Sequence, residues 1–128
     1  IEQIGAVELY KMPKSYYDEV CAEYRGRRDI VYKALQEMPG VVCEKPKGAL
    51  YVVAKLPVED AEDFIIWMLK EFDLNGETVM MAPAEGFYAT SGLGKNEARI
   101  AYVLNAAELE KAMNCLKEGL KAYTALKK

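Results

Sequence analysis

Residues 41–55, VVCEKPKGALYVVAK, decide the fold class because they contain two apolar stretches on either side of a turn. Val41-Val42-Cys43 predicts a short strand, and Pro46-Lys47-Gly48 predicts a turn. Ala49 to Lys55 predicts a second strand, in which Leu50, Val52 and Ala54 share one face and Tyr51 and Val53 the other. The two strands are so close in the sequence that we expect an antiparallel pair.

Helical patterns flank this pair. A helix is predicted from Ser15 to Met38, with Ser15 and Asp18 as a capping box, and Pro39-Gly40 ends it. Pro13 separates this helix from the segment Ile1 to Tyr10, which we interpret as the tail of an earlier helix. The arginines of the long helix alternate with acidic residues and predict a solvated face: Arg25, Arg27 and Arg28, with Glu23 and Asp29.

The second half of the chain repeats this alternation of helix and strand. A helix from Asp60 to Phe72 has Asp60 as its predicted N-cap, and a last helix follows the Asn105 to Glu108 capping box. Between them, Thr78 to Ala82 and Ala98 to Leu104 predict two strands joined by a long glycine-containing loop. The apolar stripes of the two helices are Phe64, Ile65, Met68, Leu69 and Phe72, and Leu109, Ala112, Met113, Leu116, Leu120 and Tyr123.

The order helix, two strands, helix, two strands, helix predicts the α+β class. We expect two layers, with helices covering one face of a mostly antiparallel sheet of about four strands. The 128 residues are one domain in length, so residues 1–128 are assigned to a single domain.

Composition excludes several classes of function. With 17 basic and 20 acidic residues, the net charge is -3, which gives no electrostatic basis for binding nucleic acid or an anionic membrane. No apolar run approaches the roughly 20 residues of a membrane span. The sequence has no histidine, which removes Ser-His-Asp and Cys-His catalysis and histidine-containing zinc sites.

The cysteines indicate the redox compartment, and the N-terminus indicates whether the sequence is part of a longer chain. Cys21, Cys43 and Cys115 are widely spaced and odd in number, so we expect three buried or half-buried free thiols in a reducing cytoplasm and no metal site. The opening Ile1 to Ile4 has no signal-peptide pattern. Because residue 1 is not methionine, we expect a piece of a longer chain.

Arg99 is the candidate functional residue. It lies near the start of the last predicted strand, directly after the glycine-containing loop, and shares its face with Ala101 and Val103. These small neighbours leave room for a guanidinium, whose planar fork binds a carboxylate through two parallel hydrogen bonds. The alternative from spacing alone is a surface arginine paired with Glu97 or Glu85.

Two other features are weaker candidates. The Gly92-Leu93-Gly94 run does not follow a strand and open a helix, so it is not a dinucleotide-binding loop. Tyr51 follows a glycine-containing turn and could face a cleft, although aromatic residues in strands mostly serve packing.

An ordered series of short motifs resembles the small domain of class I/II (fold type I) aminotransferases, the aspartate aminotransferase-like branch in particular. The resemblance covers nearly the whole chain. The motifs are Arg27-Arg28-Asp29, Pro39-Gly40-Val41, Pro46-Lys47-Gly48-Ala49-Leu50-Tyr51, Gly86-Phe87-Tyr88, Gly92-Leu93-Gly94 and Ala98-Arg99-Ile100-Ala101-Tyr102.

The resemblance implies a role for Arg99 and a cofactor outside this chain. In that family the matching arginine binds the α-carboxylate of the substrate, so Arg99 would orient an amino acid or 2-oxo acid. Pyridoxal phosphate would be bound by the large domain of the parent, through a Schiff-base lysine that has no counterpart here. This piece alone would bind no cofactor and be inactive. Ile4-Gly5-Ala6-Val7 matches the stretch after that lysine, so residues 1–14 would be a remnant of the interdomain helix and linker.

The resemblance also implies partners and leaves alternatives. The parent would be a homodimer, and the missing large domain would be the main partner of this chain. A pyridoxal-phosphate-dependent lyase or decarboxylase would have a similar small domain. A stand-alone α+β binding module is the remaining alternative.

Overall fold

A four-stranded antiparallel sheet with the order β1-β2-β4-β3 forms one layer of the computed structural model, which describes residues 1–127. The strands are β1 (Val42–Cys43), β2 (Tyr51–Lys55), β3 (Ala82–Pro83) and β4 (Glu97–Ala101). β2 and β4 pair at the centre, with Val53 opposite Arg99, and β3 places Ala82 on the other side of Arg99. The predicted hairpin of β1 and β2 and the α+β class are confirmed.

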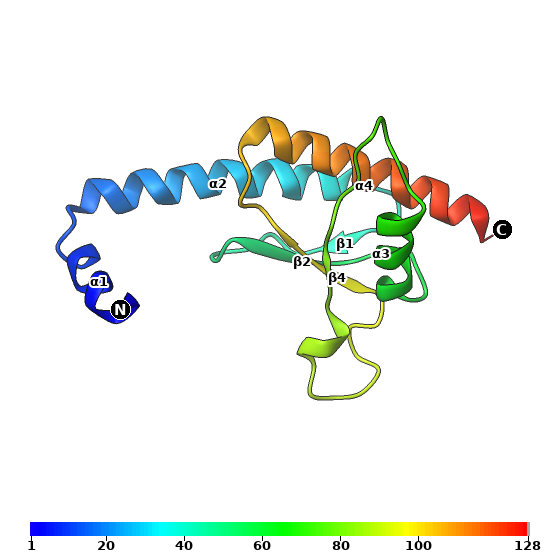
Figure 1. Ribbon diagram of the computed structural model, residues 1–128, viewed down its shortest axis with the longest axis horizontal. Coiled ribbons are helices and arrows are strands. Elements are labelled where there is room, and N and C mark those ends of the chain that lie inside the picture. Colours follow the sequence, from blue (N-terminus) through cyan, green and yellow to red (C-terminus); the bar gives the residue numbers. More distant parts are fainter. Residues whose placement is uncertain (128) are drawn as a thin grey trace.

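The second layer consists of α2 (Lys14–Gln36), α3 (Ala61–Lys70) and α4 (Ala106–Leu126). α1 (Glu2–Leu9) lies outside this layer, and a short 3₁₀ helix spans Glu85–Phe87. Figure 1 shows α2 and α4 side by side along one side of the sheet, while the loop that contains the 3₁₀ helix extends from the opposite side. One sheet face is therefore covered by helices, and the other is open apart from this loop.

The alternation of residues along β2 and β4 explains which face is covered. Val52 and Ala54 of β2 and Ala98 and Ile100 of β4 are buried against the helices. Their partners in the core include Leu35 of α2 and Leu116 of α4, which are fully buried. Burial of apolar surface contributes about 25 cal/mol per Å², so this two-layer contact is the main stabilising term. The odd-numbered residues of both strands are left on the open face.

All four strands are shorter than predicted: β1 and β2 begin one and two residues later, at Val42 and Tyr51, and β3 and β4 are shortened where contacts with helices intervene. Thr78 to Met81 are not part of β3, because the Thr78 hydroxyl donates to the Met68 carbonyl oxygen (2.7 Å) and ties this segment to the end of α3. β4 ends at Ala101 instead of Leu104, because the Val103 carbonyl oxygen accepts a hydrogen bond from Arg27 Nη1 (2.6 Å). Contacts with helices thus replace strand pairing at both places.

The helix starts confirm two of the three predicted caps. Asp60 Oδ1 accepts from the amides of Glu62 and Asp63 (2.9 and 3.2 Å), and Asn105 Oδ1 accepts from the Glu108 amide (3.0 Å). The capping box at Ser15 is wrong, since α2 begins at Lys14 after Pro13 and has no side-chain cap. The Asp18 carboxylate instead pairs with Lys14 Nζ (2.6 Å), one helical turn away.

Two exposed leucines correct the predicted apolar faces. Leu50 and Leu69 are 44% and 47% exposed, although the patterns placed them with the core residues. Leu50 precedes the first residue of β2, so it lies outside the regular alternation of that strand. Leu69 lies beyond the buried stripe of α3, which consists of Ala61, Phe64, Ile65 and Met68.

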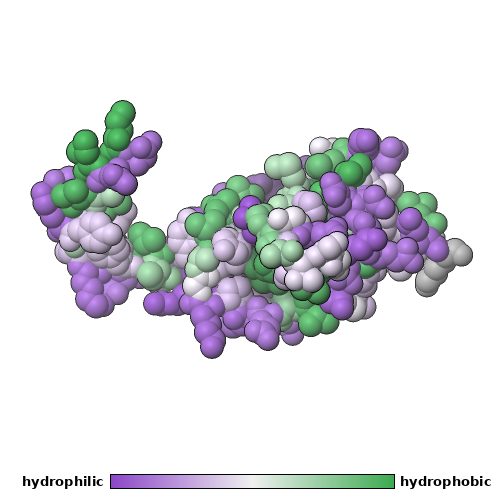
Figure 2. All heavy atoms as spheres, turned by 90° about the horizontal axis from the view of Figure 1, so that it is seen from below, coloured by the Kyte–Doolittle hydropathy of each residue, from purple (hydrophilic) through white to green (hydrophobic). Residues whose placement is uncertain are grey.

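α1 stands apart from the sheet and the other helices (Figures 1 and 2). None of its residues is buried, and Ile4 remains 79% exposed. The Tyr17 hydroxyl donates to the Leu9 carbonyl oxygen and links α1 to the start of α2. Within residues 1–127, no helix combines the length and the apolar character that a membrane crossing requires.

Candidate functional site

Arg99 lies at the middle of β4 on the open face of the sheet. Its neighbours Ala98 and Ile100 point into the core, so the alternation of the strand turns the Arg99 side chain away from the helices. The predicted face is confirmed for Ala98, Ile100 and Tyr102, which are buried, whereas Leu104 is 50% exposed. Pairing with β2 on one side and β3 on the other fixes the backbone from which the guanidinium extends.

Two aromatic rings flank the Arg99 guanidinium. Its central carbon, Cζ, is 4.8 Å from the ring centroid of Phe87 and 5.4 Å from that of Tyr51. At such distances the ring faces attract a cation, and they limit the directions in which the side chain can point. Tyr51 is 41% exposed and packs its ring against the Arg99 guanidinium, beside the candidate site.

A tyrosine of the loop before β4 forms a hydrogen bond with the carboxylate of Glu97. The Tyr88 hydroxyl donates to Glu97 Oε2 (2.5 Å), and this hydrogen bond to a carboxylate raises the pKa of Tyr88, with burial as a smaller cause. Gly92 and Gly94 have φ angles of 83° and 72°, the left-handed conformation that glycine adopts without strain. These turns return the loop to the sheet so that Tyr88 can reach Glu97.

Arg99 forms no ion pair with a carboxylate of residues 1–127. The predicted alternative, pairing with Glu97 or Glu85, is therefore not formed within this part of the chain. A half-buried guanidinium between two rings, on a face without a paired carboxylate, can accept a planar anion through two parallel hydrogen bonds. The chemistry of the arrangement is recognition and orientation of a carboxylate.

The charged side chains of residues 1–127 all reach the surface, and none of them is buried. The surroundings of Arg99 are mainly aromatic and aliphatic. No three potential metal ligands of residues 1–127 gather at one place.

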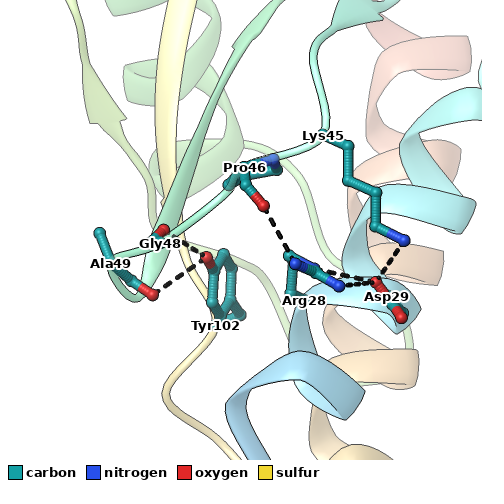
Figure 3. Close-up of polar contacts among 7 residues, drawn as sticks. All are labelled: Arg28, Asp29, Lys45, Pro46, Gly48, Ala49 and Tyr102. Carbon is teal, nitrogen blue, oxygen red and sulfur yellow. Dashed lines mark hydrogen bonds and ion pairs between the residues drawn. The ribbon is translucent and has the colours of Figure 1, made fainter. Parts of the chain in front are cut away.

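The sequence did not predict a polar network beneath the turn that precedes β2 (Figure 3). Arg28 Nη1 donates to the Pro46 carbonyl oxygen (3.1 Å), and the Tyr102 hydroxyl donates to the carbonyl oxygens of Gly48 (3.4 Å) and Ala49 (3.2 Å). The solvated face predicted for the arginines is wrong for Arg27 and Arg28, whose side chains are 20% and 19% exposed. The only sequence signal was an arginine pair in a helix followed by a Pro-Lys-Gly turn, and that pattern does not specify its partners.

Comparison with known proteins points to one group of enzymes, although no protein-family model matches the chain. The aspartate aminotransferase of Pyrococcus horikoshii is 31% identical over 122 residues, which are 92% of this chain and 29% of that enzyme. The LL-diaminopimelate aminotransferase of Oleidesulfovibrio alaskensis is 32% identical over 113 residues, 88% of this chain and 27% of that enzyme. The chain spans about 30% of the length of the curated relatives it matches.

Solved structures show the same fold. The α-aminoadipate aminotransferase from Thermus thermophilus, complexed with N-(5'-phosphopyridoxyl)-L-leucine, superposes with a TM-score of 0.76 at 28% identity, over 93% of this chain and 30% of that one. The kynurenine aminotransferase of Pyrococcus horikoshii, in complex with PMP, gives 0.72 at 27% identity, over 86% and 26%. The two-layer fold of this chain is thus shared with part of each enzyme.

Proposed function

We propose that this chain, which is homologous to aspartate aminotransferases and has the fold of an aminotransferase small domain, is the C-terminal small domain of a pyridoxal-phosphate-dependent aminotransferase. In that enzyme Arg99 binds the α-carboxylate of an amino acid or 2-oxo acid. The observation that carries the proposal is the Arg99 guanidinium, held between Tyr51 and Phe87 on the open sheet face without an acidic partner among residues 1–127.

The rings of Tyr51 and Phe87 prepare Arg99 for this role. They restrain the guanidinium before the substrate arrives, so less conformational entropy is lost on binding. Glu97 is occupied by Tyr88, so it does not compete with the substrate for the cation. A carboxylate bound through two parallel hydrogen bonds is fixed in orientation, which directs the amino nitrogen of the substrate toward one point.

The large domain of the parent supplies the remaining parts of the reaction. When bound there, pyridoxal phosphate acts as an electron sink for the bonds at the α-carbon of the substrate. We propose that this chain holds none of the cofactor and is inactive by itself. We also propose a homodimeric parent in the cytoplasm, where Cys21, Cys43 and Cys115 remain the free thiols seen here.

The test begins with the coding sequence that precedes residue 1. The full-length protein should absorb near the aldimine band of bound pyridoxal phosphate and convert an amino acid and a 2-oxo acid into the exchanged pair. Release of carbon dioxide, or of an eliminated group, without a new amino acid would assign the parent to the decarboxylases or lyases. A gene that starts at residue 1 and a product without transferase activity would favour a binding module.

Variants then test the role of Arg99 in the full-length protein. Arg99→Ala should raise the KM for the amino acid by about 30-fold or more, the equivalent of about 2 kcal/mol for a lost charged partner. Lys121→Ala is the control, because Lys121 is an exposed cation of α4, on the helix side of the sheet, and pairs only with Glu118 of the same helix within residues 1–127. Equal kinetics of the two variants would contradict the assignment.

A further inference from the structure

Hydrogen bonds from the helix side of the sheet hold the turn between β1 and β2 (Figure 3). Tyr102, which is 1% exposed, points its hydroxyl at the carbonyl oxygens of Gly48 and Ala49. Its backbone amide donates to the next carbonyl oxygen, that of Leu50 (2.9 Å). One residue therefore holds three consecutive carbonyl groups of the turn.

Arg28 holds the other end of the same turn. Its guanidinium donates to the Pro46 carbonyl oxygen (3.1 Å) and pairs with Asp29 (2.9 Å). Lys45 Nζ lies 2.9 Å from the same Asp29 oxygen, so the residue before Pro46 is also joined to α2. The hydrogen bonds from Arg28 and Lys45 lower the pKa of Asp29, which shows that its charged form is favoured in this cluster.

The backbone conformation of the turn requires such support. Ala49 has a φ of 60°, in the left-handed region that residues with a Cβ rarely adopt. Conformations of this kind persist where surrounding contacts hold them, and they concentrate near functional sites. Here the hydroxyl of Tyr102 contacts the carbonyl oxygen of the strained residue itself (3.2 Å).

The restrained turn leads directly to the aromatic ring beside Arg99. Tyr51 follows Ala49 by two residues, pairs with Ala101, and places its ring 5.4 Å from the Arg99 guanidinium carbon. Tyr102 and Arg28 thus fix the backbone of the turn from the helix side, and Tyr51, at the start of β2, flanks the Arg99 guanidinium on the open side. A change in the turn would move Tyr51, and with it one of the two rings that orient Arg99.

We propose that Tyr102 and Arg28 are positioning residues for carboxylate recognition: they hold the Pro46–Ala49 turn, including the left-handed Ala49, so that Tyr51 orients the Arg99 guanidinium. This inference rests on the proposed role of Arg99. Tyr102 is buried on the helix side of the sheet, whereas the Arg99 guanidinium lies on the open face, so its effect on Arg99 is indirect. Tyr102 and Arg28 contribute by fixing the direction in which the Arg99 guanidinium points.

The experiment uses the 128-residue chain labelled with ¹⁵N and the Nε–Hε signal of Arg99, which the rings of Tyr51 and Phe87 shift. Propionate, a simple alkyl carboxylate, is the titrant. In Tyr102→Phe, which removes only the hydroxyl, the Arg99 signal should move toward the random-coil position, and the Kd for propionate should rise by about threefold or more, as expected for a misdirected but intact charge. Arg28→Lys should give the same two changes.

The matched control is Tyr123→Phe, because Tyr123 packs between Phe64 and Trp67 and its hydroxyl donates no hydrogen bond within residues 1–127. Its Arg99 signal and Kd should equal those of the unchanged chain. If Tyr102→Phe leaves both unchanged, or if Tyr123→Phe changes them equally, the inference is overturned. Arg99→Ala separates the two proposals: propionate binding that survives this change refutes the role of Arg99, whereas its loss alongside an unaffected Tyr102→Phe refutes only the positioning role.

Discussion

Replacing Gly94 by alanine should destabilise the chain more than the same change at Gly92, although both glycines have a positive φ. A Cβ on Gly94 would overlap the Tyr88 ring and lie 3.3 Å from the Ala84 carbonyl carbon. A Cβ on Gly92 would meet no atom within 4 Å. The two substitutions therefore share the cost of a left-handed alanine, about 1–2 kcal/mol, and differ in the overlap, about 1–3 kcal/mol.

Urea denaturation of the two variants measures this difference. The free energy of unfolding should fall by about 1–2 kcal/mol in Gly92→Ala and by about 1–3 kcal/mol more in Gly94→Ala. Displacement of the Tyr88 ring should also break its hydrogen bond to Glu97, which frees that carboxylate to approach Arg99 and weaken propionate binding in Gly94→Ala alone. Equal stabilities, with equal propionate affinities, would refute the proposed contact between the loop and Tyr88.

Two further predictions concern charge and thiols. Because Arg28 and Lys45 lower the pKa of Asp29 from its ordinary value of 3.8, the contribution of this carboxylate to stability is present above pH about 4 and lost as the pH falls through the folded-state pKa. The difference in unfolding free energy between the unchanged chain and Asp29→Asn should thus be larger at pH 6 than at pH 3, and a constant difference would contradict the ion pairs. The prediction of three buried or half-buried thiols is wrong for Cys21, which is exposed, whereas burial raises the pKa of the Cys115 thiol. An aromatic disulfide reagent should therefore label Cys21 first, and labelling of both at one rate in the native chain would be inconsistent with this structure.

Local patterns predicted the elements whose partners are near in sequence. The alternation of Tyr51 to Lys55 gave the two faces of β2, and the short spacing from Val42 gave its antiparallel partner. Asp60 and Asn105 were identifiable as caps because each bonds amides within three residues. Such features depend on a few consecutive residues, so sequence reasoning reaches them.

Features that depend on distant partners were missed. Arg27 donates to Val103, 76 residues away, and this contact ends β4 earlier than the apolar run predicts. Thr78 turns to the end of α3 and shortens β3 in the same way. The left-handed Ala49 was also unpredictable, because the support for it comes from Tyr102, on a segment 53 residues later.

The candidate site was predicted in part. The position of Arg99 on the open face followed from the alternation of β4 alone. Its flanking rings did not: Phe87 reaches the guanidinium through the path of the loop, and Tyr51 through the register between β2 and β4. A sequence pattern specifies neither the path of an irregular loop nor the pairing of distant strands, and Tyr51 and Arg99 are 48 residues apart.

The most direct test of the central claim, that Arg99 binds the substrate α-carboxylate, compares two substrates in the full-length protein. One is an amino acid, and the other is the amine that lacks only the α-carboxylate. The claim predicts that Arg99→Ala lowers kcat/KM for the amino acid by about 30-fold or more and leaves kcat/KM for the amine nearly unchanged. An equal loss for both substrates would contradict the claim, because Arg99 would then act on something other than the carboxylate.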